Sequence, residues 1–141
     1  MNARSIAPIL LVLNSASSNP FGQYLGEILR TEGITAFETA QLSSLTQSQL
    51  SAYSIVIVTE MPLTATQATM FANYASAGGS LIAMRPDAQL APTFGITRAG
   101  TSTTADGYFK ATSHEASAGL NQATLQIHGV ADNYTVNSGT S

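Results

Sequence analysis

The sequence predicts an α/β fold: a doubly wound, mostly parallel sheet in a three-layer sandwich. Short continuous apolar runs, such as ILLVL at 9–13 and SIVIVTE at 54–60, are typical of strands buried on both faces of a parallel sheet. Helical patterns alternate with these runs, and right-handed crossovers place the helices on both faces of the sheet. A length of 141 residues with 44% hydrophobic content fits a single domain over 1–141.

The first helix is expected directly after the first strand. Asn19 suits the N-cap and Pro20 the first helical position, and Gly33 is expected to end the helix. Gly22 and Gly26 stand one turn apart, and each lowers helix propensity by roughly 1 kcal/mol relative to alanine. Their presence therefore indicates that the helix backbone lies close against its neighbour.

Three more strands and two more helices follow in the same alternating order. The strands are expected at 34–40, 54–60 and 80–84, with a brief helix within 45–53. The second helix is expected within 61–79 and has clear end signals. Thr64 and Gln67 have the spacing of a capping box, and Gly78 supplies a C-terminal stop.

Beyond residue 87 the pattern changes. We expect a helical turn within 88–96 and a polar loop at 98–107, followed by antiparallel or edge strands within 107–112 and 123–130. The last residues, 131–141, are expected to be a flexible polar tail. A chain that stops in such a stretch after a strand suggests a truncated domain, a fragment or module of a longer protein.

Composition excludes several kinds of partner. Only 9% of residues are charged, the net charge is −3, and no cluster of lysine or arginine offers a surface for nucleic acid or a membrane. The absence of cysteine excludes disulfides and thiolate chemistry.

No cofactor and no metal site is expected. A surface rich in serine and threonine is common in exported bacterial modules, so we expect an extracellular or periplasmic location.

Two segments carry a family resemblance, YSIVIVTEMPLTATQATMFANYASAGGSLIAMRPD at 53–87 and IHGVADNY at 127–134. The chain resembles the flavodoxin-like class I glutamine amidotransferase-like fold over about 6–136. The similarity is to the non-amidotransferase branch, which includes trehalose-utilisation-type proteins and the C-terminal domain of N,N-dimethylformamidase large-subunit-like proteins. True amidotransferases use a cysteine nucleophile, so transfer of glutamine nitrogen by that mechanism is excluded here.

Candidate ligand-binding residues follow the apolar strands. In an open parallel sheet, ligands gather at the carboxyl ends of the strands. Asn14 and Ser15 follow the first strand, Glu60 ends the third, and Arg85 with Asp87 follows the fourth. The loop SASSN could hold an anion at the start of the first helix, or its hydroxyls could only cap that helix.

Each of the sharper candidates has a structural alternative. Glu60 could serve in acid–base chemistry or form an ion pair with Arg85, and Asp87 could simply cap the following turn. His128 with Asp132 and Glu60 would suffice for an oriented base or a weak metal site, but no HxH or HExxH spacing supports a metal. A single histidine at a strand end is more often a satisfied hydrogen-bonding group.

Two functions remain open. The first is a non-catalytic amidotransferase-like module of a larger exported protein, which binds a small-molecule ligand or packs on neighbouring domains. The second is a hydrolase acting on an amide or a carbohydrate through Glu60 and His128, near Arg85. A truncated domain would expose an apolar face or an unpaired strand edge, so we also expect self-association of the isolated chain.

Overall fold

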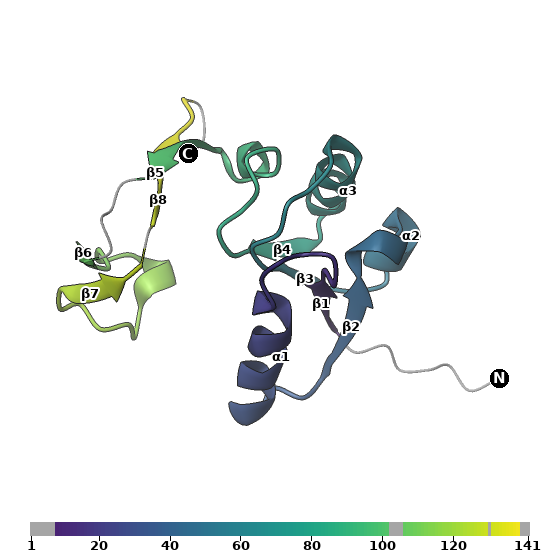
Figure 1. The fold of residues 1–141 in the computed structure, drawn as a ribbon, viewed down its shortest axis with the longest axis horizontal. Coiled ribbons are helices and arrows are strands. Elements are labelled where there is room, and N and C mark those ends of the chain that lie inside the picture. Colours follow the sequence, from purple (N-terminus) through teal and green to yellow (C-terminus); the bar gives the residue numbers. More distant parts are fainter. Residues whose placement is uncertain (1–7, 102–105, 130, 139–141) are drawn as a thin grey trace. The chain divides into compact units, whose positions relative to one another are not determined.

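The computed structural model describes residues 8–101, 106–129 and 131–138, and it divides the chain into two compact units (Figure 1). The first unit is Met1–Gly95 and the second is Ile96–Ser141. All of the α/β alternation lies in the first unit.

A parallel sheet forms the centre of the first unit. Its strands are β1 (Ile9–Leu13), β2 (Phe37–Gln41), β3 (Ile55–Val58) and β4 (Ser80–Ala83). They lie in the order β2-β1-β3-β4, and every pairing is parallel. The chain reverses direction across the sheet after β2, so this is the doubly wound α/β fold that the sequence predicts.

Helices cover the two faces of this sheet (Figure 1). Their bounds are α1 (Phe21–Thr31), α2 (Gln47–Leu50) and α3 (Ala65–Ser76). On one face, Gly22 and Gly26 are the buried residues of α1, and a Cβ added at Gly26 would lie 3.3 Å from Leu11 Cδ2. The sequence expectation of a close helix–sheet approach is therefore confirmed. The opposite face carries α2 and α3, which completes three layers.

The main core lies between the sheet and α2 with α3. Its fully buried members come from both of these layers: Leu10 and Val12 from β1, Val56 from β3, Leu50 from α2 and Phe71 from α3. Alternation along the strands sends these residues to one face and Leu11 to the α1 face.

Helix ends mostly follow the sequence signals. The capping box of Thr64 with Gln67 is present, and Gly33 and Gly78 have φ values of 84° and 95° at the ends of α1 and α3. The start of α1 is shifted by one residue from the prediction. Pro20 is the N-cap and no side chain caps the helix; the backbone N–H of Asn19 donates to Ser17 Oγ at 3.4 Å.

A 3₁₀ turn, Ala91–Phe94, ends the first unit, and two antiparallel strand pairs make up the second. Here β5 (Ile96–Thr101) pairs with β8 (Asp132–Val136), and β6 (Asp106–Phe109) pairs with β7 (Leu125–His128); a further 3₁₀ turn is Glu115–Ser117. The strands expected within 107–112 and 123–130 are confirmed as antiparallel.

Two expectations for the second unit were wrong. Residues 96–101, mostly assigned to a polar loop, form β5, and residues 132–136, assigned to a flexible tail, form β8. Most residues of these two segments are polar, which is typical of a loop. Their threonine and valine residues, however, are β-branched and suit a sheet. Arg98 Nη2 and Asp132 Oδ1 lie 2.6 Å apart across this pair, a contact between residues distant in the sequence. In the remainder of the expected loop, residues 102–105 lie outside the described residues, and residues 106–107 begin β6.

Candidate functional site

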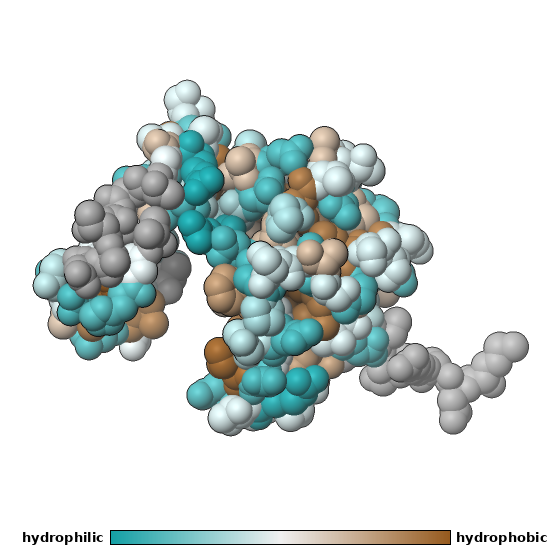
Figure 2. All heavy atoms as spheres, viewed as in Figure 1, coloured by the Kyte–Doolittle hydropathy of each residue, from teal (hydrophilic) through white to brown (hydrophobic). Residues whose placement is uncertain are grey.

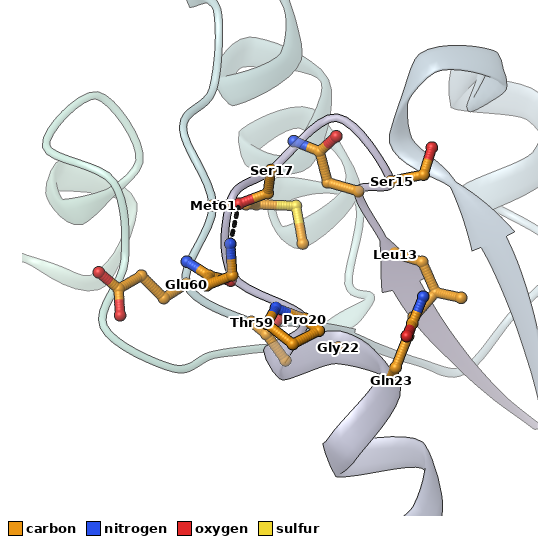
Figure 3. A pocket seen from close by; sticks show the side chains of 11 residues that line it. Leu13, Ser15, Ser17, Pro20, Gly22, Gln23, Thr59, Glu60 and Met61 are labelled. Carbon is orange, nitrogen blue, oxygen red and sulfur yellow. Dashed lines mark hydrogen bonds between the residues drawn. The ribbon is translucent and has the colours of Figure 1, made fainter.

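The carboxyl ends of β1 and β3 border a small pocket beside the start of α1 (Figure 3). Its lining includes Leu13, Asn14, Ser17, Thr59 and Glu60. The cavity volume is about 20 Å³, which is room for one water molecule. A small organic ligand therefore does not fit in the enclosed part of this crevice, although the crevice is where the fold class predicts a ligand.

The loop after β1 uses its polar groups internally. Asn14 Oδ1 accepts a hydrogen bond from the Ala16 amide at 3.1 Å, and the Ser15 amide donates to Gln41 Oε1 at 3.0 Å. The first bond closes a local turn and the second joins this loop to the end of β2. Asn14 and Ser15 thus lie at the predicted edge, in bonds that fix the loop.

Glu60 and Arg85 form the expected ion pair. Arg85 Nη1 lies 2.9 Å from Glu60 Oε1, and each side chain keeps about a third of its surface exposed, 37% and 33% respectively. An ion pair this exposed contributes about 0 to 1 kcal/mol. The carboxyl group of Glu60 points away from the other side chains of the pocket (Figure 3). The pair therefore links the ends of β3 and β4 outside the crevice.

The backbone at Arg85 has an uncommon conformation. Its φ of 49° is the one positive value among non-glycine residues in the part of the chain that the structure describes. Such a conformation costs about 1 to 3 kcal/mol, and here Pro86 restricts the residue further. The chain bends here, directly after β4, and the Arg85 side chain pairs with Glu60.

Asp87 caps the turn that follows. Its Oδ1 accepts from the Gln89 amide at 2.9 Å, and its Oδ2 accepts from the Leu63 amide at 3.4 Å. Gln89 Nε2 in turn donates to the Leu63 carbonyl at 2.6 Å. Both carboxylate oxygens thus hold backbone, which matches the structural alternative for Asp87.

The two remaining candidates lie in the second unit. His128 is the exposed last residue of β7, and Asp132 begins β8. The Asp132 side chain is 4% exposed and pairs with Arg98, as described above. The convergence of His128 with Glu60 and Arg85, which belong to the first unit, stays a prediction.

Two polar residues at the sheet edge were not singled out from the sequence. Gln41 ends β2 and binds the loop after β1, and Thr59 follows β3 and is buried. The rule that selected Asn14 and Glu60, a polar residue after a strand, would also have found both. Among the described residues, no three histidine, cysteine, aspartate or glutamate side chains are grouped as a metal ion requires. No helix in the described ranges has the length and apolar character to span a membrane.

Comparisons with known proteins give little further guidance. No family model matches the chain, and no curated protein matches it. Among solved structures, it is similar to a beta-galactosidase from Bifidobacterium adolescentis, with a TM-score of 0.48 and 11% sequence identity. That match covers 94% of this chain and 91% of the other.

Proposed function

We propose that this chain is a non-catalytic, amidotransferase-like module of a larger exported protein, and that it packs on a neighbouring domain. The observation that carries the proposal is an apolar surface on the first unit, formed by Phe21, Tyr24 and Ile28 of α1 with Ile82 and Met84 at β4. We call this surface the apolar flank. The absence of cysteine and the small, internally bonded crevice support a role without catalysis.

The orientation of α1 sets one half of the flank. Gly22 and Gly26 face the sheet, and the Arg30 guanidinium lies 4.8 Å from the centre of the Phe37 ring, on β2. One side of the helix is therefore directed toward β2. At 100° per residue, Phe21 and Ile28 lie on the opposite side, which is directed toward β3 and β4. Figure 2 shows apolar atoms gathered along one side of α1.

The edge strand β4 supplies the other half. Leu11, which contacts α1, is paired in register with Ile57, and Ile57 is paired with Ile82. Neighbours in register on parallel strands point to the same face, so Ile82 lies on the α1 face of the sheet. Met84 follows two residues later. Ile57 is buried, but Ile82 is about half exposed, so α1 covers β3 and leaves β4 open.

The size of the flank suits a protein interface. Its five side chains are each 46% to 56% exposed. If each offers roughly 200 Å² in full, together they leave about 500 Å² of apolar surface. One side of a standard interface buries about 800 Å², of which somewhat more than half is apolar. The flank thus provides the apolar area that one interface requires.

Charged substitutions in the flank test this role. The isolated chain is expected to self-associate with rising concentration, because the neighbouring domain that we propose to cover the flank is absent there. The double variant Ile28→Lys with Ile82→Lys should sediment as a monomer. Its free energy of unfolding should change by only about 1 kcal/mol, since both side chains are half exposed. Sedimentation velocity and chemical denaturation measure the two effects.

A matched variant, Thr69→Lys with Asn73→Lys, adds the same charge to exposed positions of α3. It should self-associate as the unchanged chain does. A monomeric unchanged chain at high concentration, or equal loss of association in both variants, would contradict the proposal.

A further inference from the structure

A second hollow lies on the opposite face of the sheet, over β1 and β2. It has a volume of about 480 Å³ and is lined by Leu10, Glu38, Ala40, Leu45, Gln49, Ala52 and Tyr53. The volume is in the range of small-molecule sites, about 300 to 1,000 Å³. The hollow has a plain structural cause. The helix between β2 and β3, α2, is only four residues long, so it cannot cover the strands beneath it.

One charged group is present in this apolar lining. Glu38 belongs to β2 and is partly buried, and the Tyr53 hydroxyl donates to its Oε2 at 2.9 Å. In the described part of the chain, no ion pair involves Glu38, and its Oε1 accepts no hydrogen bond. The nearest cationic residue in sequence, Arg30, stacks on Phe37, the neighbour of Glu38 along β2, whose side chain points to the other face.

We propose that this hollow binds a small organic monocation, with its apolar body over Ala40 and Leu45 and its ammonium group on Glu38 Oε1. A carboxylate at the rim of an apolar cavity favours a cationic donor, because a charge-assisted hydrogen bond is roughly twice as strong as a neutral one. Tyr53 orients the carboxylate by holding its other oxygen. The site is separate from the apolar flank and from the crevice at the carboxyl ends of the strands, so it does not depend on the proposed function.

The chemistry of the lining also sets the selectivity. An anion of the same size would meet the Glu38 carboxylate and a chain with net charge −3. A neutral ligand would keep the apolar contacts and lose the charge. A cation should therefore bind more tightly than a neutral molecule of the same shape, and an anion should bind least.

Tryptamine and its alcohol analogue tryptophol, which share shape but not charge, test this order. Titration of the isolated chain, followed by ¹H–¹⁵N NMR, should give tryptamine a Kd on the order of 1 mM, as expected for a ligand of this size. Tryptophol should bind at least about tenfold more weakly, and the shifted amides should include those of Ala40 and Ala52. Equal affinity for the two probes, or shifts confined to other residues, would overturn the proposal.

Glu38→Gln isolates the charge, because glutamine keeps an oxygen that can accept from Tyr53. This variant should lose the preference for tryptamine while binding tryptophol as before. Glu60→Gln removes a carboxylate from the same unit, outside the hollow, and should leave the preference intact. If Glu38→Gln retains the preference, or if Glu60→Gln loses it, the attraction is a general effect of net charge and no site exists at Glu38.

Discussion

Replacing Phe71 with alanine is expected to lower the free energy of unfolding by about 3 to 5 kcal/mol. Phe71 is the largest fully buried side chain among the described residues and is 0% exposed. It lies on the face of α3 that packs on the sheet. Truncation removes its transfer free energy and leaves a cavity that neighbouring side chains fill only partly. Chemical denaturation followed by far-ultraviolet circular dichroism measures the loss, since the described α-helices all lie in the first unit.

Thr69→Ala is the matched control for Phe71→Ala, because Thr69 is exposed on the same helix. Its effect should stay within about 0.5 kcal/mol. If Phe71→Ala costs no more than Thr69→Ala, α3 does not pack on the sheet as described.

Replacing Gly79 with alanine is expected to cost about 3 kcal/mol or more. A Cβ at this position would overlap sterically with the ring carbons Cζ, Cε1 and Cε2 of Tyr74. Tyr74 is 3% exposed, and its hydroxyl donates to the Tyr53 carbonyl at 3.1 Å, so the ring cannot move aside without breaking this partly buried hydrogen bond. Overpacking of a core typically costs 1 to 3 kcal/mol, and a rigid ring is at the upper end of that range.

Gly33→Ala separates this clash from backbone strain. Gly33 also precedes a strand and has a φ of 84°, yet a Cβ there would meet no atom within 4 Å. Its replacement should cost only the left-handed conformation, about 1 to 2 kcal/mol. The Tm of Gly79→Ala should therefore be clearly lower than the Tm of Gly33→Ala in thermal unfolding. The reverse order would show that the ring of Tyr74 moves aside.

The first unit could be predicted from the sequence because its signals are local and consistent with one another. The apolar run at 9–13 and the capping box at Thr64 each specify an element without reference to the rest of the chain. The second unit could not. Strand β5 depends on pairing with β8, more than 30 residues later, and its polar residues resemble a loop until that partner is known.

The candidate site was predicted in position more fully than in role. Strand ends placed Asn14, Glu60 and Arg85 at one edge of the sheet, as parallel topology requires. Their roles depend on hydrogen bonds and on a few ångströms of free space, which spacing in a sequence does not encode. Gln41 is an example, since its bond to Ser15 closes a loop 26 residues earlier. The hollow at Glu38 arises from the shortness of α2, which a helix pattern alone indicated only as a brief helix.

The most direct test of the proposed role is the solvent exposure of the apolar flank in the larger protein of which we propose that this chain is a module. Hydroxyl-radical labelling modifies aromatic and methionine side chains in proportion to their exposure, so Phe21, Tyr24 and Met84 report on the flank. The proposal predicts strong labelling of all three in the isolated chain and severalfold weaker labelling in that larger protein. Met61, which is buried, serves as the weakly labelled reference in both. Equal labelling of the three flank residues in the two proteins would contradict packing on a neighbouring domain.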